Sequence, residues 1–173
     1  MNNIVLANFV RFIGLLLVQG LVLRRMEFDE FGWNYIHVLV YPLFILMLPF
    51  RTPRPLVIAS GFAMGILVDF FYYTPGLHAS AATFLAWARA GVLSWLEPLG
   101  RYNLNQSPTK ARLGRNWFLR YAAIMMGIHL LFYFSVEAFT FVYIDRILLN
   151  SLVTFALSFP AVIALVGLIN PLD

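Results

Sequence analysis

The chain has 173 residues, of which 61% are hydrophobic, 17% aromatic and 12% charged, and its mean hydropathy is +0.80. A soluble domain needs more charge than this to cover its surface, so the composition excludes a soluble globular protein and large domains outside a membrane. The sequence has no cysteine, which excludes disulfides, thiolate zinc sites and cysteine nucleophiles.

Six apolar segments are predicted to cross the hydrocarbon core of a bilayer, which is about 30 Å thick. They cover residues 4–23, 33–50, 55–73, 78–96, 117–136 and 147–169. The second segment is the least regular, because it is short and contains His37, Pro42 and Pro49, and other groups must satisfy the carbonyls that proline frees. The sequence therefore predicts an all-α, polytopic membrane protein with a single integral membrane domain over residues 1–173.

The basic residues predict how these spans are oriented. Six Arg or Lys residues lie in the loops 51–54 and 97–116, whereas three lie on the opposite side, Arg24, Arg25 and Arg146. Cytoplasmic loops are enriched in Lys and Arg, so we expect both basic loops and both termini in the cytoplasm. If residues 33–50 did not cross, the N-terminus would lie outside.

The pI is near 9.7, but the basic residues lie in short loops beside the spans. Attraction to anionic lipid headgroups therefore explains them better than nucleic-acid binding. The basic loop 97–116 is the longest one and the best placed to present a binding surface. A solvated linker and contact with a partner are both open interpretations of this loop.

Small and polar residues at four-residue spacing predict a tight helical hairpin in the middle of the chain. One face of the span 55–73 carries Gly61, Gly65 and Asp69. After a turn that contains Gly76, one face of the next span carries His78, Ala82 and Ala86. We expect the two faces to pack together, with a contact between Asp69 and His78 across the bend.

Ionisable groups inside spans are costly and each needs a specific reason. Arg11 and Arg89 both lie roughly 10 Å inside the cytoplasmic ends of their spans, which allows a shared acidic or headgroup ligand, and Arg11 can also extend to the interface. Asp69 lies near the outer interface, where a structural polar pair is favoured over a role in transport or proton relay.

Polar residues also share faces within the first and last spans. The first span carries Asn8 and Gln19 at similar angles, and the last carries Asn150, Thr154 and Ser158. Such faces are typical of helices that hydrogen-bond to a neighbour in the same chain or in a partner.

Catalytic interpretations find little support in the sequence. His37, His78 and His129 all fall in the outer half of the spans, but their spacing does not match paired metal ligands on one helix. Ser80 is close to His78 in sequence but lies on a different helical face, without a nucleophile motif around it. We therefore expect no enzyme activity, no metal and no cofactor.

A resemblance to one family follows from three stretches of the chain. The run Gly65-Ile66-Leu67-Val68-Asp69-Phe70, then Pro75-Gly76-Leu77-His78-Ala79 and Arg89, resembles in order and spacing the central signature of MreD, the rod shape-determining membrane protein family. Residues 48–54 and 117–129 are also similar, so the likeness covers nearly the whole chain. One departure is Trp87, where a tyrosine is expected two residues before the arginine.

The resemblance implies a scaffold that is not an enzyme and lies in the bacterial inner membrane. It implies binding to the single-span protein MreC and joint action with MreB, RodA and its partner transpeptidase in the elongasome, which maintains cell shape and organises lateral peptidoglycan synthesis. Under this interpretation the MreC span packs on the polar or small-residue faces. The candidate structural or partner-binding residues are Arg11, Gly61, Gly65, Asp69, Gly76, His78, Ala82, Ala86 and Arg89.

The resemblance also implies a six-helix fold similar to the S components of energy-coupling-factor transporters. A membrane subunit that binds a vitamin-like small molecule is therefore the alternative function. S components dock on their transporter through small residues at every fourth position of the first span. Here Ala7 is followed at that spacing by Arg11 and Leu15, which argues against such docking.

Overall fold

The computed structural model describes residues 2–26, 37–104 and 106–169. Within these ranges the regular secondary structure is helical, with no strands. The α-helices are α1 (Asn2–Leu17), α2 (Leu43–Leu46), α3 (Arg54–Tyr72), α4 (Leu77–Trp95), α5 (Lys110–Leu113), α6 (Arg115–Ala138) and α7 (Ile144–Ile169). A π-helical turn (Val18–Val22) and a 3₁₀ turn (Leu23–Met26) continue α1, and a second 3₁₀ turn (Phe141–Tyr143) precedes α7.

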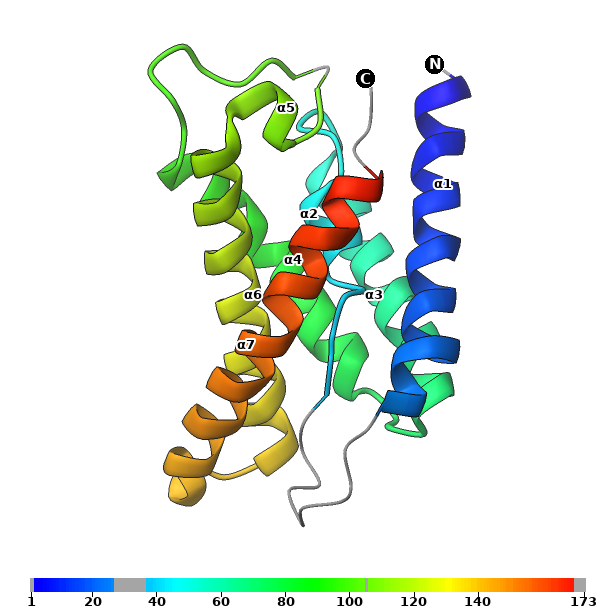
Figure 1. The fold of residues 1–173 in the computed structure, drawn as a ribbon, viewed down its shortest axis with the longest axis vertical. Coiled ribbons are helices and arrows are strands. Elements are labelled where there is room, and N and C mark those ends of the chain that lie inside the picture. Colours follow the sequence, from blue (N-terminus) through cyan, green and yellow to red (C-terminus); the bar gives the residue numbers. More distant parts are fainter. Residues whose placement is uncertain (1, 27–36, 105, 170–173) are drawn as a thin grey trace.

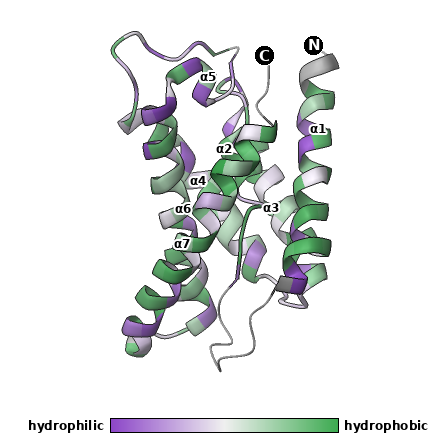
Figure 2. Ribbon diagram, in the orientation of Figure 1, coloured by the Kyte–Doolittle hydropathy of each residue, from purple (hydrophilic) through white to green (hydrophobic). Residues whose placement is uncertain are grey.

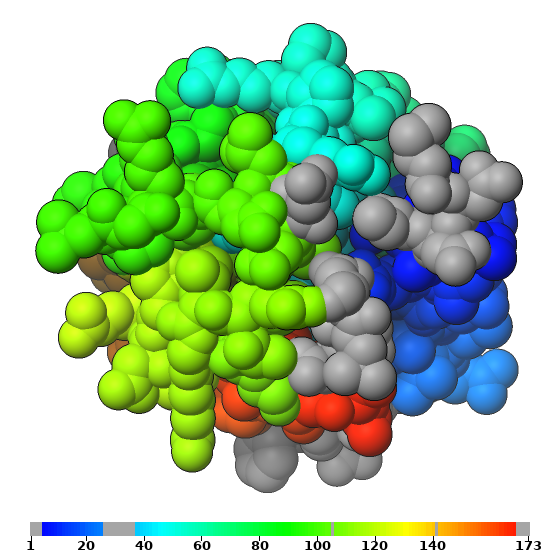
Figure 3. All heavy atoms as spheres, turned by 90° about the horizontal axis from the view of Figure 1, so that it is seen from above, coloured from blue at the N-terminus to red at the C-terminus, as the bar shows by residue number. Residues whose placement is uncertain are grey.

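The five long helices form an antiparallel bundle in which α3 packs on α4, α4 on α6, and α6 on α7 (Figure 1). The π-helical turn after α1 packs on α3, so α1 closes the other side. Seen from above, the chain runs in order around the molecule from blue to red (Figure 3). We call the end that holds α5 and the starts of α1, α3 and α6 the basic end, and the opposite end the far end.

Four helical segments are long and apolar enough to cross a membrane. They are Val5–Arg25, Arg54–Tyr72, Arg115–Ala138 and Ile144–Leu168. Large apolar side chains face outward from the bundle, such as Phe70, which is 74% exposed, and Leu152, which is 67% exposed. Figure 2 shows hydrophobic residues along the long helices. These features indicate a multi-pass membrane protein and confirm the predicted all-helical class.

The predicted helical span over residues 33–50 is wrong. Residues 33–36 lie outside the described residues, and residues 37–50, which we call the central segment, contain only the single helical turn α2. The central segment runs through the middle of the bundle from the far end towards the basic end (Figure 1), and residues 39–49 are all buried. Pro42 and Pro49 have no N–H to donate, so a continuous helix is disfavoured here.

The predicted packing of α3 on α4 is confirmed. A Cβ at Gly65 would lie 2.5 Å from the Ala79 Cα and 2.5 Å from the His78 carbonyl oxygen, and a Cβ at Gly61 would lie 2.9 Å from the Ala82 carbonyl oxygen. Ala86 is also buried against Gly61. Because the two faces pack on each other, they are not open to a third helix, which corrects the expectation that they meet a partner.

The loop between α4 and α6 folds back on the basic end of the central segment. The Phe50 N–H donates to the Gln106 carbonyl (3.1 Å), and the Arg51 N–H donates to the Leu104 carbonyl (3.1 Å). The Tyr102 ring stacks on Phe50 with 4.3 Å between ring centroids. The loop is therefore more than the solvated linker that was one interpretation of residues 97–116.

Gly65→Ala tests the close approach of α3 and α4. The new Cβ must displace the α4 backbone, and such overpacking lowers stability by about 1–3 kcal/mol. We expect a lower Tm in detergent, whereas Gly91→Ala, where a Cβ meets nothing within 4 Å, should leave the Tm unchanged or slightly raised. Equal melting temperatures for the two variants would contradict the packing described here.

Candidate functional site

Gln19 supplies hydrogen bonds to the far-end half of the central segment. Its Nε2 donates to the Val38 carbonyl (3.0 Å) and to the Tyr72 hydroxyl (2.7 Å). Its Oε1 accepts from the Val40 N–H (2.8 Å) and the Tyr41 N–H (3.3 Å). Buried backbone groups outside a helix need such partners, and one fully buried amide therefore satisfies three of them.

Ser158 of α7 holds the same stretch from the other side. Its Oγ accepts from the Leu39 N–H at 2.9 Å, and Ser158 is completely buried. The polar faces predicted in the first and last spans do meet a neighbour, as expected for Gln19 and Ser158. The neighbour is the non-helical central segment rather than another helix.

Arg89 anchors the other half of the central segment. Its Nη2 donates to the Leu48 carbonyl, and its Nε donates to the Tyr121 hydroxyl (3.2 Å), which in turn donates to the Leu46 carbonyl (3.2 Å). Arg89 is only 4% exposed. Arg89 therefore joins α4 to α6 and to the central segment.

Arg11 makes a local hydrogen bond. Its Nη1 donates to Asn8 Oδ1 at 3.1 Å, one turn away on the same helix. Arg11 is half-buried, whereas Arg89 is buried. Of the two predicted intramembrane arginines, Arg89 is therefore the more deeply buried.

Asp69 joins the two helices of the hairpin. Its Oδ1 accepts from the Thr74 hydroxyl (3.0 Å), the His78 N–H (2.9 Å) and His78 Nδ1 (3.0 Å), and its Oδ2 accepts from the Gly76 and Ala79 N–H groups (both 3.0 Å). Gly76 lies in the left-handed region (φ 87°), which glycine adopts without strain. A carboxylate from α3 thus caps the N-terminus of α4, and the predicted Asp69–His78 contact is confirmed.

Aromatic rings surround His78 and fill the far-end half of the interior. The His78 ring centroid lies 5.0 Å from that of Tyr72, 5.1 Å from Tyr133 and 5.6 Å from Tyr41. The Tyr41 hydroxyl lies 2.9 Å from His129 Nε2. His78 and His129 are completely buried, and this cluster connects the hairpin, the central segment and α6.

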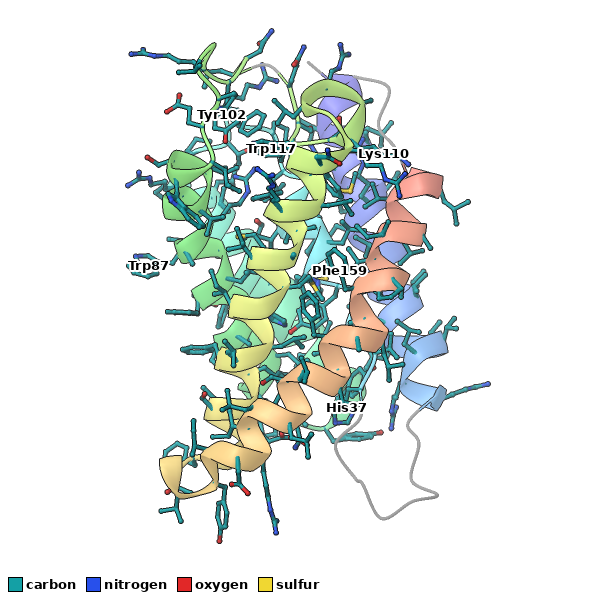
Figure 4. All side chains as sticks on the ribbon, turned by 60° about the vertical axis from the view of Figure 1, so that its left-hand side comes forward. His37, Trp87, Tyr102, Lys110, Trp117 and Phe159 are labelled. Atoms are coloured by element: carbon teal, nitrogen blue, oxygen red, sulfur yellow. The ribbon has the colours of Figure 1, made fainter. Side chains whose placement is uncertain are left out.

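The three histidines gather in one half of the bundle, as the sequence predicted. The His37 ring lies 6.4 Å from the rings of Tyr72 and Tyr133, on the far-end side of the interior (Figure 4). Within the described part of the chain, no group of three His, Asp or Glu side chains is placed to hold a metal ion. The His78 and His129 side chains form hydrogen bonds inside the protein, and this is the role that their positions support.

A pocket of about 200 Å³ opens at the basic end, beside Arg89. Its polar lining residues are Thr52, Arg54, Arg89, Ser94, Glu97 and Tyr102. The Tyr102 hydroxyl donates to the Leu93 carbonyl (2.8 Å), and the ring lies against Trp117 with 5.8 Å between centroids (Figure 4). Burial, with a further contribution from nearby Glu97, raises the pKa of Tyr102 to about 12, so its hydroxyl stays protonated.

A second, apolar groove of about 600 Å³ follows the outward side of the α3–α4 hairpin. Its lining includes Ile58, Phe62, Ile66, Ala79, Thr83 and Trp87. Trp87 is 65% exposed and points away from the bundle (Figure 4). This groove lies along helices of membrane-spanning length, so whatever occupies it must itself be apolar.

Sequence reasoning missed Tyr41 and Tyr121, which bond a distant histidine and a distant carbonyl. Neither contact has a local sequence pattern. The available signal was indirect, since Pro42 and Pro49 within one apolar stretch call for external hydrogen-bond partners.

No family model, curated protein or solved structure matches the chain. Its function is therefore inferred from the geometry of its own residues.

Gln19→Leu tests the role of the amide that bonds the central segment. The change leaves the Val38 carbonyl and the Val40 N–H without their partner, and each unsatisfied buried group costs about 1–3 kcal/mol. We expect a large fall in Tm or in the yield of folded protein. Asn150→Leu, which removes an amide from a cavity between α6 and α7, should have a much smaller effect. Similar losses in both variants would show that Gln19 has no special role.

Asp69→Asn and Asp69→Ala separate the charge of the cap from its shape. The asparagine variant keeps one acceptor oxygen but turns an NH₂ towards N–H donors, and the alanine variant loses every bond. The Tm should therefore fall in the order wild type, Asn, Ala, with a total loss of about 3–5 kcal/mol for Ala. Asp145→Asn, at an exposed position of α7, is the control and should melt like wild type.

Proposed function

We propose that this protein is an MreD-like scaffold, not an enzyme, that binds MreC in the bacterial inner membrane and helps to maintain rod shape by organising lateral peptidoglycan synthesis. The proposal rests on the contacts made by the residues that resemble the MreD signature. Gly65, Asp69, Gly76, His78 and Arg89 all contact other parts of the same chain. They build a frame whose outer faces are left for partners.

The proposal includes a topology of six crossings with both termini in the cytoplasm. The five long helices make five crossings, and the central segment makes the second crossing without being a helix. Two observations support this topology. The start of α1 and the end of α7 lie at the basic end (Figure 1), and the arginine and lysine residues of α5 and its flanking loops favour the cytoplasmic side.

The MreC span is proposed to bind in the apolar groove on the α3–α4 hairpin. The groove extends along both helices at membrane depth, and exposed rings of Phe62 and Trp87 border it. A membrane helix can fill such a surface by close packing, which is the main source of helix association in lipid. The groove takes the place of the small-residue faces as the proposed MreC site, because α3 and α4 bury those faces against each other.

The alternative function is binding of a vitamin-like molecule, as in an S component. The buried Tyr41, His78, His129 and Tyr133 side chains disfavour it, because their rings fill the far-end half of the interior. A vitamin that raised the Tm of the purified protein would favour this alternative. Stable capture of MreC from the organism's own membranes, with no shift in a broad vitamin screen, would favour the scaffold.

Thr83→Trp tests the groove as the MreC site. Thr83 lines the groove and is half-buried, so an indole there should block a partner helix without entering the core. We expect co-purification of MreC in mild detergent to fall at least several-fold at an unchanged Tm. The matched control is Leu152→Trp on the outward face of α7, which should capture MreC like wild type. Full capture by Thr83→Trp would refute this binding site.

A further inference from the structure

The charge of Arg89 is only partly accounted for by its contacts inside the protein. Its hydrogen-bond partners, the Leu48 carbonyl and the Tyr121 hydroxyl, are neutral. Among the residues that the structure describes, no carboxylate lies within ion-pair distance of Arg89. A buried guanidinium without a counter-ion is costly, and a guanidinium with free N–H donors is well suited to a phosphate.

The pocket beside Arg89 provides a place for such a counter-ion. Arg89 lines this pocket, hydroxyls of Thr52 and Ser94 add neutral polar groups, and exposed Arg54 adds a second positive charge. The stacked rings of Phe50 and Tyr102 support one side. The pocket thus combines a buried cation, an exposed cation and an apolar wall.

The position of the pocket indicates the source of the phosphate. It lies where α3 begins and α4 ends, and Trp95, the last residue of α4, is 75% exposed. Exposed tryptophan at a helix end is typical of the headgroup layer. Exposed Arg101 lies in the loop beside the pocket and adds to the positive charge.

We propose that this basic-end pocket binds the phosphate of an anionic phospholipid, with Arg89 at its base and Arg54 at its entrance. The lipid tails would lie along the outer surface of α3 and α4, next to the pocket. This inference goes beyond the proposed scaffold function, and the binding can be measured on the chain without MreC.

Glu97 provides an internal test, because its carboxylate lines the same pocket. If a lipid phosphate is the natural counter-ion, Glu97 repels it, and Glu97→Gln should strengthen lipid binding. If instead Glu97 itself neutralises Arg89, then Glu97→Gln should lower the Tm of the lipid-free protein and leave lipid affinity unchanged.

The experiment measures binding of phosphatidylglycerol, phosphatidylcholine and inorganic phosphate to the purified full chain in detergent by native mass spectrometry. Arg54→Gln removes the entrance charge, and Arg51→Gln makes the same charge change at a nearby residue outside the pocket lining. Ala90→Leu fills the pocket without changing charge, and Ala88→Leu is its control on the same helix. Tm values of all variants identify any that do not fold.

We expect phosphatidylglycerol to bind more tightly than phosphatidylcholine. Arg54→Gln should weaken binding about tenfold, which corresponds to the loss of one charge-assisted contact, and Ala90→Leu should weaken it to a similar extent because the larger side chain occupies the pocket. The two controls should bind like wild type. Equal binding of both lipids, or unchanged binding by Ala90→Leu, would overturn the proposal. Inorganic phosphate that binds as tightly and competes would assign the pocket to a soluble phosphate compound and overturn the lipid assignment.

Discussion

The need to satisfy backbone hydrogen bonds away from water determines how this protein is built. The central segment, residues 37–50, is buried in the middle of the bundle but makes only one turn of helix. The N–H and C=O groups that this turn leaves unpaired need partners from outside the segment, and Gln19, Ser158 and Arg89 with Tyr121 provide them from four different helical elements. Polar residues that look costly in membrane spans are explained by this one requirement.

The α3–α4 hairpin gives these contacts a fixed frame. Gly61 and Gly65 bring the two helices together, and the Asp69 carboxylate in α3 caps the N-terminus of α4. The hairpin then holds the central segment at two points along α4, where His78 packs on Tyr41 and Arg89 bonds to the Leu48 carbonyl. A rigid interior with apolar outer faces is what a scaffold for membrane helices requires, and it supports the proposed role.

The sequence predicted the regular parts of this structure well. The length of the apolar segments predicted the long helices. Small and polar residues at four-residue spacing predicted the α3–α4 packing and the Asp69–His78 contact. It did not predict that the central segment is mostly non-helical, because a buried non-helical stretch and a buried helix have the same apolar composition. It also did not predict the partners of Arg89, since a side chain that bonds a carbonyl 41 positions away leaves no local pattern to detect.

Amide hydrogen exchange in the central segment tests the side-chain support most directly. The structure predicts that the Leu39 and Val40 amides exchange slowly in the wild type, because Ser158 and Gln19 accept their hydrogen bonds. In a destabilising but folded Gln19 variant such as Gln19→Ala, the Val40 and Tyr41 amides should exchange fast, while amides inside α6 stay protected. Unchanged protection of Val40 and Tyr41 in that variant would mean that helical backbone bonds hold them, and would contradict the non-helical crossing.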